Sequence, residues 1–159
     1  MNYFLVVKRK VVLFLITLLL GFHGSPTPKE VHMTTKAPLT QSDLDQFYGS
    51  ENYYRNFTGL IYTDGIAFLA EHAGAYWLID AIGSHQLDPK LKKGGLRDMQ
   101  FWNLKVNPDK SAILTCREDS GIAPAITQEI SFTDFPLPEI DIWVGRDERG
   151  MIAMLTSEY

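Results

Sequence analysis

Residues 62–86 read YTDGIAFLAEHAGAYWLIDAIGSHQ and form the longest strongly apolar run beyond the N-terminal segment. Asp64 can cap a helix, because its carboxylate accepts the free backbone N–H groups of the first turn. Four apolar residues then follow at the spacing of one helix face: Ile66, Leu69, Ala70 and Ala73. Gly74 is suited to end that helix, because glycine tolerates the left-handed backbone conformation. We therefore predict two helices separated at Gly74, with one continuous helix as the alternative.

Asp80 is the one charged residue in the apolar run AYWLIDAI. A buried carboxylate must be paired, hydrogen-bonded or protonated. One interpretation is an acid with a raised pKa that faces a ligand. The other is a structural acid that accepts hydrogen bonds from a backbone N–H, a tyrosine hydroxyl or an arginine. We favour the structural interpretation, because most buried polar groups are simply satisfied.

Length and charge restrict the classes of function. A chain of 159 residues predicts one domain. Residues 1–32 hold four basic residues and one acidic residue, so the net charge of −4 leaves −7 on residues 33–159. A domain this acidic has no general electrostatic reason to bind nucleic acid, and we predict none as a partner.

The single cysteine, Cys116, excludes an internal disulfide and any metal site built from several cysteines. It lies in the apolar sequence AILTC, which favours a packed core thiol over a reactive nucleophile.

The N-terminal segment allows two interpretations. The apolar run Val11–Phe22 follows three basic residues, as in a signal peptide, and is shorter than the roughly 20 residues of a transmembrane helix. The protein would then be exported or membrane-anchored through this run. Alternatively, residues 1–32 are a mis-assigned start and translation begins at Met33. We prefer the Met33 start, which predicts a cytoplasmic protein.

The second half of the chain changes to strand-like alternation. Five candidate strands are separated by short turns: residues 99–106, 111–117, 125–132, 140–144 and 151–156. Short connections favour an antiparallel arrangement. We predict a single α+β domain over residues 33–159, in which N-terminal helices (about 40–93) pack on one face of an antiparallel sheet of about five strands (about 99–157).

An aromatic patch precedes the apolar run: Tyr53, Tyr54, Arg55 and Phe57. Aromatic and arginine side chains dominate protein-binding hot spots. The patch is therefore a candidate recognition surface, and the alternative is a helix edge whose tyrosines pack on the core. Trp102 or Trp143, on an exposed sheet face, would extend such a surface. Trp143 should lie opposite the core isoleucines, because side chains alternate along a strand.

The sequence contains few features that indicate a metal site or a catalytic nucleophile. His72, Asp80 and His85 are the nearest potential ligands, but their spacing matches no tight metal-binding pattern. His72 is better explained as a last-turn histidine that interacts with the helix dipole. No nucleophile elbow, phosphate-binding loop or dinucleotide fingerprint occurs. We therefore predict no metal and no cofactor.

The sequences LTQSDLDQFYGSENYYRN (39–56) and YTDGIAFLAEHAGAYWLIDAI (62–82) resemble a family of small uncharacterised proteins of bacteria, plasmids and phages. The family is a domain of unknown function, and the resemblance is best over Leu39–Ser84. It implies no activity. Its members start close to this block, which favours Met33 as the start.

Two hypotheses of function follow. The first is a non-enzymatic module that binds another protein through the aromatic patch. The second is a small-ligand-binding protein or enzyme whose pocket brings together Asp80, His72 and Tyr62. We favour the first, because the second requires three side chains from separate positions to converge on one cavity.

Overall fold

The computed structural model describes residues 39–159. The predictions made for residues 1–32 and for the start at Met33 lie outside the described residues. Among residues 39–159, no helix is long and apolar enough to cross a membrane.

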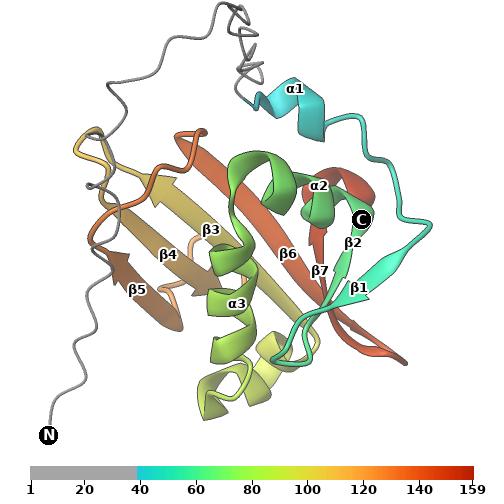
Figure 1. Cartoon of the computed structure of the whole chain (residues 1–159). Coiled ribbons are helices and arrows are strands. Elements are labelled where there is room, and N and C mark those ends of the chain that lie inside the picture. The colour runs from blue at the N-terminus through green and yellow to red at the C-terminus, as the bar shows by residue number, and fades with distance from the viewer. Residues whose placement is uncertain (1–38) are drawn as a thin grey trace, which may run out of the picture. The chain divides into compact units, whose positions relative to one another are not determined.

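A seven-stranded sheet is the centre of the fold (Figure 1). Its strands are β1 (Tyr53–Arg55), β2 (Ile61–Thr63), β3 (Met99–Val106), β4 (Ala112–Arg117), β5 (Ile126–Ile130), β6 (Glu139–Asp147) and β7 (Gly150–Leu155). They lie in the order β1-β2-β7-β6-β3-β4-β5. Neighbouring strands are antiparallel except β2 and β7, which are parallel.

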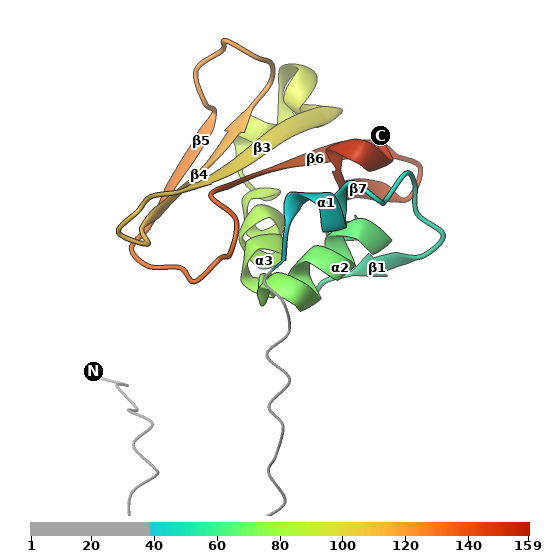
Figure 2. The same ribbon diagram turned by 90° about the horizontal axis from the view of Figure 1, so that it is seen from above.

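Three α-helices lie on the same side of this sheet, as Figures 1 and 2 show. They are α1 (Gln41–Leu44), α2 (Asp64–Ala73) and α3 (Tyr76–His85). Three 3-10 helices complete the described chain: η1 (Pro89–Lys92), η2 (Gly94–Arg97) and η3 (Thr156–Glu158).

The predicted break between two helices is confirmed. Gly74 ends α2 with a left-handed φ of 61°, and its N–H donates to the carbonyl of Ala70. The predicted cap was wrong by one residue, because the Thr63 hydroxyl accepts the N–H of Ile66. Asp64 is the first helical residue, and its carboxylate accepts other hydrogen bonds.

The predicted sheet was incomplete. It has seven strands instead of about five, it contains one parallel pair, and the helices do not all precede the strands. The two strands that the sequence analysis missed, β1 and β2, have three residues each. So short a strand cannot show a recognisable alternation. Three residues of the aromatic patch lie on β1 and Phe57 follows it, so the patch is not a helix edge.

The hydrophobic core lies between the helices and one face of the sheet. Alternate residues of β3 point into it, including Trp102, which is only 1% exposed. The suggestion that Trp102 lies on an exposed face was therefore wrong. The indole N–H donates to Gln100 Oε1 at 2.9 Å, so this buried tryptophan has its polar atom satisfied.

The carboxylate of Glu158 connects the end of the chain to the start of α2. It accepts the Thr63 hydroxyl at 2.6 Å and the Gly65 N–H at 3.1 Å. It also accepts the N–H of Leu155 at 2.9 Å, where β7 ends. One side chain thus connects the parallel strands β2 and β7 at their carboxyl ends.

Replacing Glu158 with alanine should lower the free energy of unfolding by about 1–3 kcal/mol, because three donors lose their acceptor. Urea denaturation measures this change. Glu148→Ala, in the exposed turn between β6 and β7, is the matched control and should stay within about 0.5 kcal/mol of the wild type. Equal stability of the two variants would contradict the role given to Glu158.

Candidate functional site

A shallow groove of about 600 Å³ lies between the β1–β2 hairpin and α2. We call it the tyrosine groove. Its aromatic lining is Phe47, Tyr54, Tyr62, Phe68 and Tyr76, and its acidic lining is Glu51, Asp64 and Glu71, with His72 beside them. No lysine or arginine lines it.

The strand side of the groove is built around Tyr54. Its ring stacks on Tyr62, with centroids 5.4 Å apart, and its hydroxyl donates to Asp64 at 3.0 Å. This hydrogen bond to the carboxylate raises the pKa of Tyr54. The backbone N–H of Asn52, with smaller contributions from the Tyr54 hydroxyl and the N–H of Glu51, lowers the pKa of Asp64. Asp64 is therefore an ionised carboxylate that orients the chain before β1.

The helix side of the groove is built from the last turns of α2 and the first residue of α3, Tyr76. The His72 ring stacks on Phe68 at 3.7 Å, and its Nδ1 lies 2.9 Å from the Phe68 carbonyl oxygen. Because a carbonyl only accepts, Nδ1 carries the proton. The Tyr76 hydroxyl donates to Glu71 at 3.3 Å. Partial burial, and then the Glu71 charge, raise the pKa of Tyr76.

The structure brings together only part of the predicted pocket. Tyr62 and His72 line the tyrosine groove, whereas Asp80 does not. Asp80 is half-buried, and its carboxylate accepts the side-chain amide of Asn56 at 3.3 Å. The partner is a side-chain amide, whereas the structural interpretation named a backbone N–H, a tyrosine hydroxyl or an arginine.

Strand alternation divides the aromatic patch. Tyr54 faces the groove, whereas Tyr53 and Arg55 lie on the opposite face of β1. The guanidinium of Arg149 lies 3.8 Å from the Tyr53 ring centroid. Phe57 follows the strand and is 82% exposed. Only Tyr54 of the four patch residues is therefore part of the groove.

Some groove residues were missed because they stand on the second face of α2. Asp64, Phe68 and Glu71 follow one another at helical spacing, beside the apolar face that predicted the helix. The spacing of these three residues could have been recognised in the sequence. Their position opposite Tyr54 could not have been predicted, because it depends on the β1–β2 hairpin, which the sequence did not reveal.

A second recess, of about 540 Å³, lies on the sheet face opposite the helices. Its lining includes Phe101, Asn103, Lys105, Arg117, Glu139, Asp141 and Trp143. The half-buried Trp143 lies opposite the buried isoleucines of β6, as predicted.

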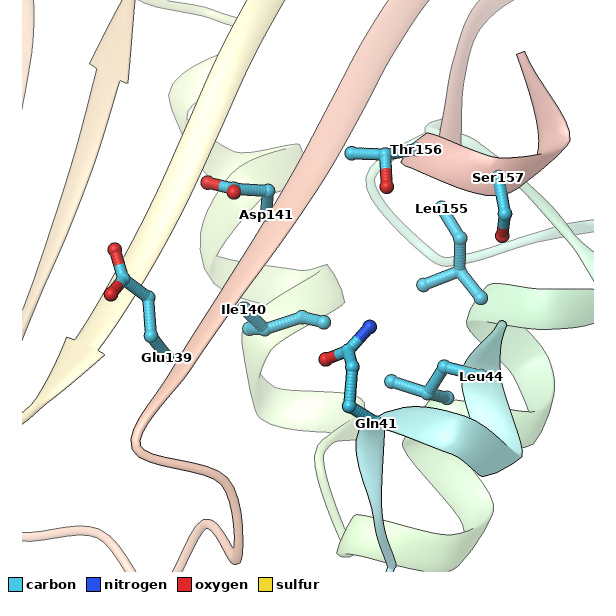
Figure 3. Close-up of a pocket in the computed structure, with 8 residues that line it drawn as sticks. All are labelled: Gln41, Leu44, Glu139, Ile140, Asp141, Leu155, Thr156 and Ser157. Atoms are coloured by element: carbon cyan, nitrogen blue, oxygen red, sulfur yellow. The ribbon is translucent and has the colours of Figure 1, made fainter.

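A third recess, of about 250 Å³, lies between α1, β6 and η3 (Figure 3). Figure 3 shows the Gln41 side chain within it, whereas the carboxylates of Glu139 and Asp141 point away from Gln41, towards β3. The Gln41 amide donates to Asp45 at 3.0 Å. The two charged residues that line this recess, Glu139 and Asp141, thus direct their carboxylates away from it.

Potential metal ligands and the one cysteine can be located within the described residues. Within residues 39–159, no three histidine, cysteine, aspartate or glutamate side chains cluster at metal-binding distance. In the same range, every buried side-chain nitrogen and oxygen has a hydrogen-bond partner. Cys116 is fully buried, and its burial raises the pKa of the thiol to about 12.

The sequence profile of DUF6876, a family of unknown function, matches residues 38–159. The chain belongs to this family. No curated protein and no solved structure matches it. The DUF6876 match confirms the resemblance to a domain of unknown function and extends it from Leu39–Ser84 to all the described residues.

Cys116 should be inert in the folded protein. With a pKa of about 12, its thiolate fraction at pH 8 is about one in ten thousand. A chromogenic disulfide reagent at pH 8 should label the folded chain far more slowly than the chain in guanidinium chloride, which exposes the thiol. Equally fast labelling of both states would show that the thiol is accessible.

Asp64 should contribute to the acid sensitivity of the fold. Its folded pKa lies below the ordinary value of 3.8, so its stabilising effect is present above that value. The effect disappears as pH falls through the folded pKa. Asp64→Asn should therefore show a shallower loss of melting temperature between about pH 5 and pH 2. Glu148→Gln is the control and should retain the wild-type slope.

Proposed function

We propose that this domain is a non-enzymatic protein-interaction module whose tyrosine groove binds a lysine- or arginine-bearing segment of another protein. The observation that carries the proposal is the lining of the groove. Three tyrosine rings and three carboxylates line it, and no lysine or arginine is among the lining residues.

The charge of the surrounding chain favours the same partner. Residues 39–86 contain six acidic residues and one basic residue, Arg55, which gives a net charge of −5. Residues 87–159 contain twelve acidic and nine basic residues, a net charge of −3. The elements that form the groove are thus the most acidic part of the described chain, and their field attracts a basic partner.

The groove offers two kinds of contact to a basic side chain. A lysine or arginine over a tyrosine ring gains about 0.5–2 kcal/mol from the ring quadrupole. Asp64 and Glu71 add negative charge next to the rings of Tyr54 and Tyr76. Phe47 and Phe68, which are packed together at 5.1 Å, offer an apolar contact to a neighbouring residue.

The shape of the groove favours a peptide over an enclosed small molecule. Small-ligand sites bury most of their ligand, whereas this groove is shallow and borders exposed rings such as Tyr54 and Tyr76. The competing ligand-binding hypothesis also loses Asp80, which lies outside the groove.

Selection from a random peptide library displayed on phage, with the full chain immobilised, tests the proposal. Enriched peptides should carry lysine or arginine next to an apolar residue. Glu71→Lys and Tyr76→Ala change exposed side chains of the groove, and each should weaken binding of a selected peptide about tenfold, equivalent to about 1.4 kcal/mol.

Glu129→Lys is the matched control, because it makes the same charge change on β5, away from the groove. It should bind the selected peptide as the wild type does. Enrichment without basic residues, or equal weakening by Glu71→Lys and Glu129→Lys, would contradict the proposed groove.

A further inference from the structure

The sheet face opposite the helices carries a mixed row of apolar and charged side chains. We call the residues Phe101, Asn103, Lys105, Glu139, Asp141 and Trp143 the open face. They belong to the neighbouring strands β3 and β6, and no described α-helix covers them (Figure 2).

The apolar part of the open face is an aromatic cluster. Trp143 meets Phe101 edge-on, with ring centroids 5.4 Å apart. Tyr159 meets the same indole at 5.0 Å and is itself 80% exposed. Large half-exposed aromatic side chains of this kind are typical of interface centres.

In the charged part of the open face, hydrogen bonds within the chain hold two carboxylates in place. The Asn103 amide donates to Glu139 at 2.7 Å and to Asp141 at 2.8 Å. It holds two carboxylates side by side on β6. Lys105 lies across from Glu139 on β3, yet neither side chain belongs to any of the ion pairs within residues 39–159.

We infer that the open face binds a second copy of this chain, as a symmetric dimer. In register, Phe101 lies across from Trp143. Asn103 likewise lies across from Asp141, and Lys105 from Glu139. A two-fold axis can run parallel to the strands, in the plane of contact between the copies and midway between β3 and β6. It places β3 of each copy over β6 of the other.

The exchange makes the face complementary to itself. Lys105 of each copy lies over Glu139 of the other, so two opposite-charge pairs form. Phe101 lies over Trp143 of the other copy, next to these pairs. Sheets packed face to face are about 10 Å apart, within reach of lysine and tryptophan side chains. This inference is independent of the tyrosine groove, which lies on the helix side of the sheet.

Sedimentation velocity of the full chain tests the dimer. The wild type should sediment as a dimer, whereas Lys105→Glu and Glu139→Lys should each weaken self-association at least tenfold, because each places like charges across the axis. Both changes are at exposed positions, and circular dichroism verifies that each variant is folded.

Mixing the two variants separates a dimer from a merely structural effect. Lys105→Glu carries two acids at these positions and Glu139→Lys carries two bases, so an equimolar mixture should form a mixed dimer. Fluorescence-detected sedimentation, with one variant labelled at its N-terminus, measures that species. A monomeric wild type, or variants that associate as the wild type does, would overturn the inference. So would folded variants whose mixture stays monomeric, because contacts within one chain cannot produce a mixed species.

Discussion

The carboxylate of Glu158 is the contact on which the arrangement of the sheet depends. Strands β2 and β7 are the one parallel pair, and most of the described chain lies between them. Parallel neighbours cannot be joined by a tight turn, so a tertiary contact must hold them in place. By accepting hydrogen bonds from Thr63, Gly65 and Leu155, Glu158 fixes the start of α2 and the end of β7 around one charged group. The geometry of the tyrosine groove depends on this contact, because β2 and α2 form two walls of the groove.

The sequence predicts the features that depend on local periodicity. The strand at Met99–Val106 and the helix break at Gly74 are found where the pattern places them. It does not predict β1 and β2, because a strand of three residues is too short to show a period. The parallel pairing of β2, Ile61 with Ile152, also joins residues that are far apart in the sequence. The candidate site shows the same division. Tyr54, Tyr62 and His72 were candidates by residue type. The absence of Asp80 from the groove lining depends on the tertiary structure, which the sequence pattern does not show.

The two sides of the sheet have different chemistry. On the helix side, buried polar groups are satisfied internally, as in the reciprocal amide pair of Gln86 and Gln100. On the open side, the Asn103 amide donates hydrogen bonds to two carboxylates, Glu139 and Asp141, which are exposed. Satisfied interior polar groups give a rigid scaffold, and a rigid scaffold keeps exposed side chains ordered before any partner arrives.

The sequence separation of 95 residues between Thr63 and Glu158 has a consequence for synthesis in the cell. A ribosome extends the chain from its N-terminus, so β1, β2 and α2 emerge long before their acceptor is made. The antiparallel strands β3, β4 and β5 can pair as they appear, but the edge of β2 must remain unpaired with β7 until β7 itself has been translated. The sheet can therefore be completed only after β7 and Glu158 have both been made, and a chain that stops before Glu158 lacks the carboxylate that joins β7 to the start of α2.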